Sequence, residues 1–351
     1  MTAAIAAAVA AVALAAGGGS TDARLSADQL VGQRLVVGFA GTEVPDSVRS
    51  MVAAGDLAGV VLFNTNFSTP DEAAALVADL RSIPLPPEAR EPLLVMVDQD
   101  GGVVKRLPGP PDLSAAQMGA AGPATCGRQG DATGAMLRRV GFDTDLAPVL
   151  DVAAPGSAMG AEGRSFGADP AVVARCAEAF ADGLERNGVT PTAKHFPGIG
   201  AATEDTDVGV QRIEVSRAHL RRVDEAPYRT FASGGGAGRL VTLSSAVYPA
   251  FGDRPASLEP ALATEELRDR LGFRGVSMTD ALETTAAFGE PAQTAVMAAH
   301  AGADLLVFTS DADAATAVKP LRDLLGEPRW RQRFAIAVER VRELRARLAG
   351  G

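Results

Sequence analysis

The chain has 351 residues, of which 47% are hydrophobic and 22% are charged. This composition is typical of a packed globular protein and excludes a disordered one. The formal net charge is −10, and nucleic acid or an anionic membrane surface would repel such a protein, so neither is expected as its main partner. The length allows one large α/β barrel or two medium domains.

The first twenty residues differ from the rest of the chain. MTAAIAAAVAAVALAA at 1–16 is almost wholly small and apolar, GGGS follows at 17–20, and Ala13-Leu14-Ala15 fits the small-x-small pattern of a cleavage site. The run is too short and too rich in alanine for a stable membrane span, and no Lys or Arg precedes it. We expect residues 1–20 to be an export signal, with the disordered leader of a cytoplasmic protein as the alternative, and residues 25–351 to form the folded domain.

Cys126 and Cys176 are the only cysteines. In an exported protein they can form a disulfide, because both are expected near the starts of neighbouring helices. The alternative is two unrelated buried thiols. Their spacing is not that of a metal site or a redox motif.

Short apolar runs alternate with longer helical patterns. The runs are continuous rather than alternating in hydrophobicity, as in parallel strands that are buried on both faces. Eight strand–helix pairs predict a (β/α)8 TIM barrel that forms a single catalytic domain, and the arginine-rich segment 328–349 is expected to pack outside it. Strands are predicted at 34–40, 58–63, 93–97, 143–147, 190–194, 239–243, 275–278 and 303–308, and helices at 46–54, 70–82, 130–140, 170–187, 216–233, 263–271, 292–301 and 311–325.

A doubly wound open sheet is the competing fold. It would need five or six strands and a phosphate-binding glycine turn after the first strand. No G-x-G-x-x-G follows residues 34–40, so the barrel is favoured.

Unusual polar residues follow the predicted strands, which is where barrel enzymes collect their chemistry. They come after the second, third, fourth, fifth and seventh strands. They are Asn64, Asn66, Asp98, Asp100, Arg106, Asp151, Arg164, Lys194, His195 and Asp280.

Two carboxylates that face each other are the usual groups for glycosidic bond cleavage. Asp280, at a strand end, fits a nucleophile, and the acidic cluster of Glu204, Asp205 and Asp207 on the loop after the fifth strand fits a proton donor. The alternative for Asp280 is a helix cap ahead of Ala281.

Sugars are held by paired hydrogen bonds to neighbouring hydroxyls. The strand-end residues that supply donors and acceptors are Asp98, Arg106, Arg164, Lys194 and His195. The alternative for Lys194 and His195 is a surface ion pair or a strand-end histidine with satisfied hydrogen bonds. The other two histidines, His219 and His300, lie within helical patterns and carry no motif.

Six motifs follow one another along the chain: GVVLFNTNF at 59–67, VDQDGGVVKRL at 97–107, DLAPVLDV at 145–152, GRSFGADP at 163–170, AKHFPGIG at 193–200 and GVSMTDAL at 275–282. In these motifs the chain resembles glycoside hydrolase family 3, in its single-domain β-N-acetylglucosaminidase branch. The resemblance implies a (β/α)8 barrel and a retaining mechanism that uses no metal or cofactor, with a carbohydrate as substrate. It assigns the role of nucleophile to Asp280 and sugar binding to Asp98, Arg164, Lys194 and His195.

Two positions depart from the branch pattern, which reads KHFPGHG and then Asp-Ser-His. Ile199 replaces the second histidine of the first motif, and Asp205-Thr206-Asp207 replaces Asp-Ser-His. Asp207 therefore stands where the resemblance places the proton-donating histidine. Two close carboxylates resist carrying two negative charges, so we expect one of Asp205 and Asp207 to hold a proton and Asp207 to act as the general acid/base.

The leading hypothesis is a retaining β-N-acetylhexosaminidase that acts outside the cytoplasmic membrane on terminal N-acetylglucosamine, for example of cell-wall fragments. A second is a degenerate family member that binds carbohydrate or a partner without turnover, because the dyad histidine is missing. A third is an aldolase-type barrel in which Lys194 forms a Schiff base, although no apolar pocket that would depress its pKa is evident around it.

Overall fold

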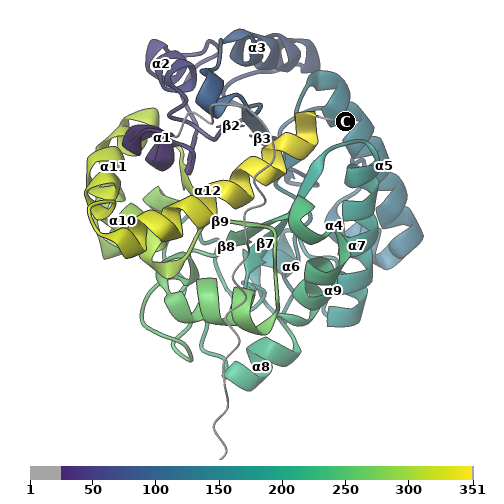
Figure 1. Cartoon of the computed structure of the whole chain (residues 1–351). Coiled ribbons are helices and arrows are strands. Elements are labelled where there is room, and N and C mark those ends of the chain that lie inside the picture. Colours follow the sequence, from purple (N-terminus) through teal and green to yellow (C-terminus); the bar gives the residue numbers. More distant parts are fainter. Residues whose placement is uncertain (1–24, 350–351) are drawn as a thin grey trace, which may run out of the picture.

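The computed structural model describes residues 25–349, so the expected leader at 1–20 lies outside the described part of the chain. Eight parallel strands close into a barrel, in which neighbours in sequence pair and the last strand pairs with the first (Figure 1). The predicted (β/α)8 TIM barrel is therefore confirmed. Its strands are β1 (Leu35–Val37), β2 (Gly59–Leu62), β3 (Leu94–Val97), β6 (Thr144–Asp145), β7 (Thr190–Phe196), β8 (Leu240–Leu243), β9 (Val276–Ala281) and β10 (Leu305–Phe308).

Successive residues of a strand point to opposite faces, which gives the barrel two apolar layers. Val36 and Val61 belong to the cluster inside the barrel, whereas Leu35 and Val60 belong to the larger core between the strands and the helices. Burial on both faces explains why the strands read as continuous apolar runs in the sequence.

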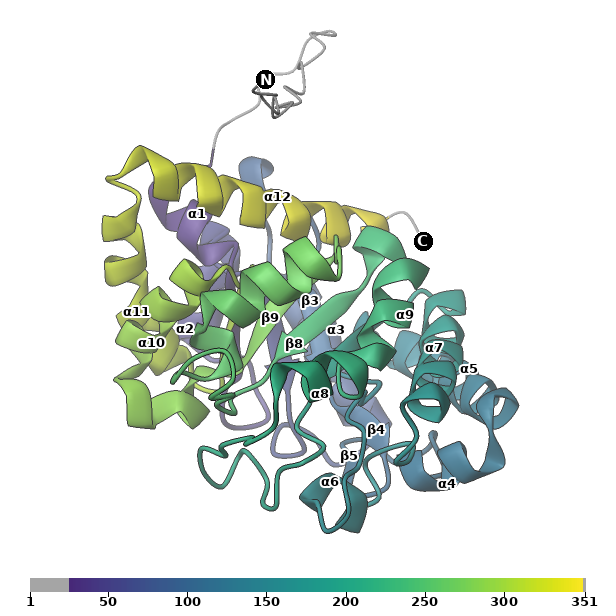
Figure 2. The same ribbon diagram turned by 90° about the horizontal axis from the view of Figure 1, so that it is seen from below.

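The helices surround the barrel (Figures 1 and 2). None of those between residues 25 and 349 has the length and apolar character needed to cross a bilayer. They are α1 (Ala27–Gly32), α2 (Asp46–Ala54), α3 (Pro70–Ser82), α4 (Ala115–Ala121), α5 (Pro123–Val140), α6 (Ala158–Ala161), α7 (Pro170–Arg186), α8 (Arg217–Arg222), α9 (Ala226–Gly234), the π-helix η4 (Ala261–Arg270), α10 (Pro291–Ala301), α11 (Asp311–Leu324) and α12 (Pro328–Ala349), with short 3-10 turns η1 (Pro87–Ala89), η2 (Gly236–Gly238), η3 (Ala256–Leu258) and η5 (Leu282–Phe288).

The prediction of one helix at 216–233 is wrong. Two helices, α8 and α9, occupy this stretch, and Pro227 lies in the first turn of the second. A proline in a helix interior removes a hydrogen bond and clashes with the preceding turn, whereas the first turn tolerates it. The helix predicted at 130–140 begins earlier, at Pro123, and the short helices α1, α4 and α6 were not predicted.

The two ends of the barrel differ. Segment 328–349 forms α12, which lies across the amino-terminal end. Arg345 donates a hydrogen bond of 2.7 Å to the carbonyl of Pro92, just before β3, and Val341 and Leu344 pack with the inner strand residues. Figure 2 shows α12 on one side of the molecule and the hairpin of β4 (Gln99–Gly101) and β5 (Val104–Lys105) toward the other. The carboxyl ends of the strands are left open for a site.

Cys126 on α5 and Cys176 on α7 are both buried and free. The Cys126 thiol lies 3.4 Å from the carbonyl oxygen of Met118, to which it donates. Of the two alternatives that the sequence leaves open, the structure contains the pair of free thiols.

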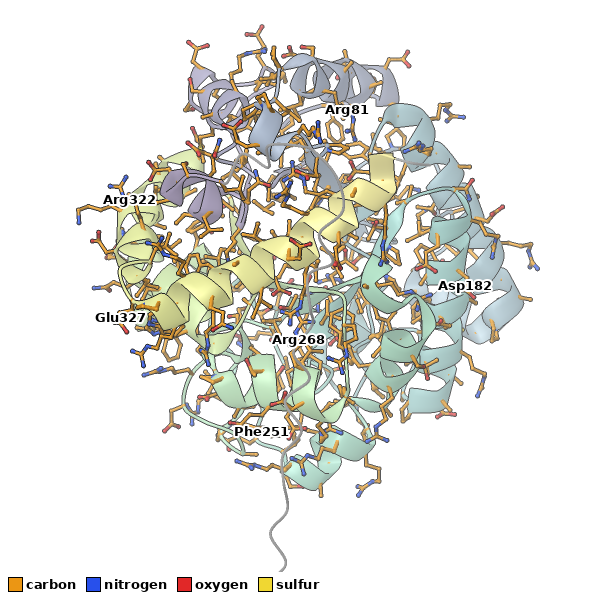
Figure 3. All side chains as sticks on the ribbon, viewed as in Figure 1. Arg81, Asp182, Phe251, Arg268, Arg322 and Glu327 are labelled. Carbon is orange, nitrogen blue, oxygen red and sulfur yellow. The ribbon has the colours of Figure 1, made fainter. Side chains whose placement is uncertain are left out.

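Arg239, directly before β8, joins the barrel to α7. Its guanidinium is 1% exposed and lies 2.8 Å from carboxylate oxygens of Glu178 and Glu185 and 3.1 Å from Asp182, which Figure 3 labels on α7. Removing one partner of a buried ion pair leaves the other charges uncompensated. We therefore expect Arg239→Ala to lower the free energy of unfolding by about 3 kcal/mol in a denaturant titration.

Arg186 on the same helix provides the matched control. Its ion pair with Asp131 is exposed, with 56% and 54% of the two side chains accessible. Exposed pairs contribute little, so Arg186→Ala should change the free energy of unfolding by less than about 1 kcal/mol. Equal losses in the two variants would show that the buried cluster does not hold β8 to α7.

Candidate active site

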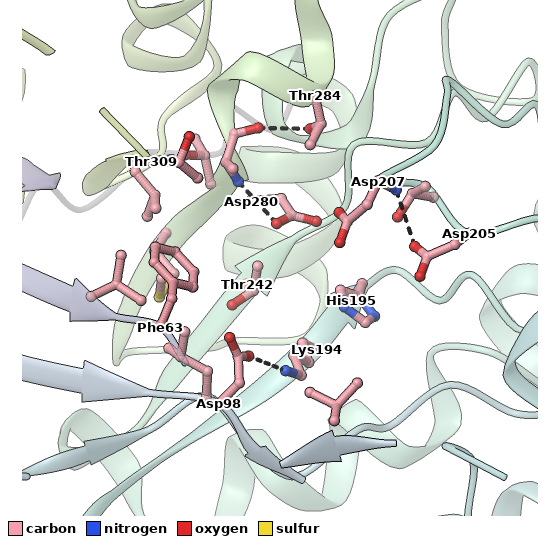
Figure 4. A pocket seen from close by; sticks show the side chains of 18 of the residues that line it. Phe63, Asp98, Lys194, His195, Asp205, Asp207, Thr242, Asp280, Thr284 and Thr309 are labelled. Atoms are coloured by element: carbon pink, nitrogen blue, oxygen red, sulfur yellow. Dashed lines mark hydrogen bonds and ion pairs between the residues drawn. The ribbon is translucent and has the colours of Figure 1, made fainter. Parts of the chain in front are cut away.

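A pocket of about 400 Å³ opens at the carboxyl ends of the barrel strands, where polar residues were expected to gather. Figure 4 shows Asp280 and Asp207 near each other in the pocket and Asp98 and Lys194 facing them from below. The eight site residues predicted from the sequence all line it: Asp98, Arg106, Arg164, Lys194, His195, Asp205, Asp207 and Asp280.

Lys194 and Asp98 form the centre of the charged part of the pocket. The Lys194 ammonium lies 2.6 Å from Asp98 Oδ1 and 3.0 Å from Asp100 Oδ1, and Arg106 approaches the other oxygen of Asp98 at 3.6 Å. Burial by itself would raise the pKa of Asp98, but the charges of Lys194 and Arg106 outweigh it and lower that pKa. The group therefore presents a fixed carboxylate and a fixed ammonium side by side, which suits neighbouring hydroxyls of a sugar.

The surroundings of Lys194 speak against Schiff base chemistry. Burial alone would lower the pKa of Lys194, but the charges of Asp100 and Asp98 more than compensate, and the pKa is raised. A Schiff base requires a neutral amine, which enzymes obtain by lowering the pKa of the lysine. The aldolase hypothesis loses its support at this position.

His195 is held by Asp151 at the end of β7. His195 Nδ1 lies 2.8 Å from Asp151 Oδ2, and the Ile199 amide donates to Asp151 Oδ1 at 2.7 Å. Asp151 is wholly buried. Asp151 engages Nδ1, and His195 lines the pocket. The other ring nitrogen, Nε2, is therefore the one available to a ligand.

Asp280 lies within β9, and its carboxylate accepts a hydrogen bond of 2.9 Å from the Ala281 amide. The short helix η5 that follows has Ala281 as its N-cap and no side-chain cap, so the alternative role of Asp280 as a helix cap is wrong. Burial raises the pKa of Asp280; the charge of His195 opposes that rise, and the charge of Asp207 adds to it.

The loop after β7 is fixed by Asp205 and carries Asp207. Asp205 Oδ1 accepts a hydrogen bond of 3.0 Å from the Asp207 amide, and its other oxygen lies 3.8 Å from Arg164 Nη1. Arg164 in turn lies 3.4 Å from Asp100. Within residues 25–349, no hydrogen bond or ion pair reaches the Asp207 carboxylate, which points toward Asp280 in Figure 4.

The expectation that Asp205 and Asp207 form the interacting carboxylate pair needs correction. Asp205 turns to the Arg164 guanidinium and to the backbone of the loop. The carboxylate that feels the charge of Asp207 is that of Asp280. A backbone contact and an ion pair therefore engage both oxygens of Asp205.

Residues 26–344 match the model of the glycosyl hydrolase family 3 N-terminal domain. The chain belongs to this family. A β-hexosaminidase of Stenotrophomonas maltophilia is 33% identical, over 78% of this chain and 82% of the relative. An "uncharacterized secreted glycosyl hydrolase" of Arthroderma benhamiae is 36% identical, over 79% and 80% of the two chains.

Solved structures agree with the family 3 assignment. A β-N-acetylhexosaminidase from Beutenbergia cavernae superimposes with a TM-score of 0.84 at 31% identity, over 92% of this chain and 99% of the other. A family 3 β-N-acetylglucosaminidase from Paenibacillus gives a TM-score of 0.85 at 31% identity, over 93% of this chain and 63% of the longer one. The protein is therefore a glycosidase of the β-N-acetylglucosaminidase branch of family 3.

The two departures from the family 3 branch pattern have unequal consequences. Ile199 is buried in a cluster with Val149 and Tyr248 and does not line the pocket. Asp207 does line it. The change at 199 therefore alters packing beneath the site, whereas the change at 207 alters the site itself.

The apolar and hydroxyl-bearing residues that line this family 3 pocket were not predicted from the sequence. Asn64 lies outside the pocket, and Asn66 is buried, where its amide donates to the carbonyls of Phe39 and Gly41. Apart from Val104 on the hairpin strand β5, the missed residues lie in or after a barrel strand, which was the available signal. They are Val61, Phe63, Val104, Leu146, Thr206, Thr242, Met278, Thr279, Ala281, Thr284, Val307 and Thr309.

No group of three or more His, Cys, Asp or Glu side chains in the described chain has the arrangement of a metal site. Asp98 is instead engaged by Lys194 and Arg106, and Asp100 by Lys194 and Arg164.

Proposed function

We propose that this family 3 glycosidase is a retaining β-N-acetylhexosaminidase that removes terminal β-linked N-acetylglucosamine through a covalent glycosyl–aspartate. One observation carries the proposal: Asp280 and Asp207 face each other in the pocket that also holds the paired Lys194 and Asp98 (Figure 4). The names of the relatives, β-hexosaminidase and β-N-acetylglucosaminidase, support the choice of sugar. The secreted relative supports action outside the cell, with cell-wall fragments as one source of substrate.

In the first step, a carboxylate oxygen of Asp280 attacks the anomeric carbon of the bound sugar. The bond from that carbon to the leaving oxygen breaks, and the oxygen takes a proton from the Asp207 carboxyl group. The ring hydroxyls are held during this step by Asp98, Arg106, Arg164, Lys194 and His195. Their ion pairs fix them in advance, so little reorganisation is needed when the substrate binds.

In the second step, Asp207 acts as the base. It accepts a proton from a water molecule, whose oxygen attacks the anomeric carbon and displaces Asp280. Two displacements at one carbon restore the original β configuration. The loop position of Asp207 suits both steps, because a loop can move as the leaving group departs and water enters.

The charges of the two acids favour a second candidate, a family member that binds carbohydrate with little or no turnover. The nucleophile must be ionised while the acid carries the proton, but burial and the charge of Asp207 raise the pKa of Asp280. In the free protein the raised pKa favours the protonated form of Asp280, which is not a nucleophile. For fast turnover, substrate binding would have to leave Asp280 ionised and Asp207 protonated.

An activity panel separates the two candidates. Purified protein is incubated with 4-nitrophenyl glycosides of β-N-acetylglucosamine and β-glucose, and the anomer released first is identified by NMR. The proposal predicts hydrolysis of the N-acetylglucosaminide with the β anomer formed first. Binding of N-acetylglucosamine in calorimetry without release of nitrophenol would favour the binding protein, and release of the α anomer would rule out a retaining mechanism.

A further inference from the structure

Helices α5 and α7 lie side by side on the outside of the barrel (Figures 1 and 2). Glycines bring their backbones into contact. A Cβ atom at Gly130 of α5 would lie 2.9 Å from the Cα of Phe180, and one at Gly183 of α7 would lie 2.4 Å from the amide nitrogen of Asp131. Side chains at these two glycines would hold the helices apart, so α5 and α7 pack more closely than helices that meet through side chains on both surfaces.

Facing residues fix the register of the two helices. Gly130 faces Phe180, and one turn later Gly134 faces Leu184, whose Cα would lie 3.1 Å from a Cβ at that glycine. Both members of the second pair lie four residues beyond those of the first. The helices therefore run parallel, and moving by one turn on both helices leads from one facing pair to the next.

This register places Cys126 opposite Cys176, one turn before Gly130 and Phe180. Both cysteine side chains are fully buried, and neither lines the pocket. A hydrogen bond with Cys176 raises the pKa of the Cys126 thiol, and the same contact lowers the pKa of Cys176. The two thiols are therefore in contact within the interface between α5 and α7.

We propose that Cys126 and Cys176 form a disulfide that links α5 to α7 when the chain folds in an oxidising compartment. The structure describes the reduced pair. A disulfide requires Cα atoms about 4.4–6.8 Å apart, a separation that helices in backbone contact provide. Disulfides persist in secreted proteins and are rare in the cytosol. The cross-link is independent of the proposed function.

The bond forms by thiol–disulfide exchange with a small disulfide such as oxidised glutathione. In the folding chain the Cys126 thiolate attacks one sulfur of this disulfide, whose S–S bond breaks, and one glutathione leaves. As α5 and α7 approach, the Cys176 thiolate attacks the Cys126 sulfur and displaces the second glutathione. Each cysteine loses a proton and each departing glutathione takes one up, so two cysteines are oxidised and one glutathione disulfide is reduced.

The cross-link closes a loop of roughly 50 residues. This loop contains β6 and two residues of the site region, Asp151 and Arg164. A cross-link removes conformations from the unfolded chain, and its effect grows with the length of the loop. The oxidised protein is therefore expected to melt about 5 °C above the reduced protein.

The test is refolding of the full chain from urea in a mixture of reduced and oxidised glutathione, with dithiothreitol in a parallel sample. Once the native near-UV circular dichroism has returned, free thiols are blocked with iodoacetamide in urea, and the intact mass is measured. The glutathione sample should lack the mass of two hydrogen atoms and carry no blocked thiol, and peptide mapping should join the peptides that contain Cys126 and Cys176. The dithiothreitol sample should carry two blocked thiols.

Two variants act as controls. Cys176→Ser should form no cross-link within the chain, and its melting temperature should be the same in both buffers. Combining Arg175→Cys with Cys176→Ser moves the thiol to the neighbouring exposed position on α7, about 100° around the helix. This double variant should not form the cross-link to Cys126 when it is natively folded.

Blocked thiols or glutathione adducts at Cys126 and Cys176, in wild-type protein that has regained its native spectrum, would overturn the proposal. A cross-linked product without the native spectrum, or equal cross-linking in the double variant, would also overturn it. Protein exported to a bacterial periplasm, a compartment in which disulfides form, is mapped in the same way, so the result does not depend on refolding. Free thiols in that sample would contradict the proposal, and the joined peptides would support it.

Discussion

Asp280→Asn is expected to lower kcat by at least about a thousandfold on every N-acetylglucosaminide, because an amide cannot form the glycosyl–enzyme intermediate. The substitution keeps the shape of the side chain, and its oxygen can still accept the 2.9 Å hydrogen bond from Ala281. The fold and the sugar-binding pair of Lys194 and Asp98 should therefore persist. The measurement is steady-state kinetics on protein whose melting temperature matches that of the wild type.

Binding provides the control for Asp280→Asn. The Kd for N-acetylglucosamine should stay within about tenfold of the wild-type value, because the hydroxyl-binding side chains are untouched. Activity within tenfold of the wild type would show that Asp280 is not the nucleophile. Loss of binding together with activity would indicate a role in holding the sugar instead.

Asp207→Ala is expected to separate substrates by their leaving groups. The rate on a disaccharide such as N,N′-diacetylchitobiose should fall by about 10²- to 10⁴-fold, because its alkoxide needs a proton as it departs. The rate of the first step on a 2,4-dinitrophenyl glycoside should fall far less, since that group leaves without protonation. The measurement is pre-steady-state release of the two leaving groups. An equal loss on both substrates would contradict the assignment of Asp207 as the general acid.

The pH profile gives Asp207→Ala a second readout. Protonated Asp280 is not a nucleophile, so kcat/KM falls as the pH drops through its raised pKa. The charge of Asp207 contributes to that rise, and its removal favours the ionised form of Asp280, so the acid limb should move to lower pH. Glu204→Gln, an exposed carboxylate on the same loop that does not line the pocket, should leave the acid limb in place.

Much of the fold could be predicted from the sequence because parallel strands buried on both faces leave a direct signal. Val36 and Val61 inside the barrel alternate with Leu35 and Val60 outside it, which makes the runs continuously apolar. The charged site residues could be predicted for a related reason. Polar residues at the ends of such runs have few structural roles, so they mark the open end of the barrel.

Two kinds of feature could not be predicted from the sequence. One depends on the direction in which a side chain points, and the other on a proline that interrupts an amphipathic helical pattern. The sequence spacing predicted that Asp205 and Asp207 interact as a pair of carboxylates. In the structure Asp205 forms an ion pair with Arg164, and the charge of Asp207 acts on Asp280. Phe63 gave no signal, because an apolar residue at the end of an apolar run reads as core. The break between α8 and α9 depends on Pro227, and the amphipathic pattern by itself does not predict a break there.

The central claim is that Asp280 forms a covalent bond to the sugar, and mass spectrometry of a trapped intermediate tests it most directly. The protein is incubated with 5-fluoro-N-acetylglucosaminyl fluoride, a slow substrate with a good leaving group, then digested with pepsin at low pH. The account predicts that the peptide containing residues 275–282 gains the mass of one fluorinated sugar residue on Asp280, and that Asp280→Asn gains none. Hydrolysis without labelled peptide, or a label on Asp207 in place of Asp280, would contradict it.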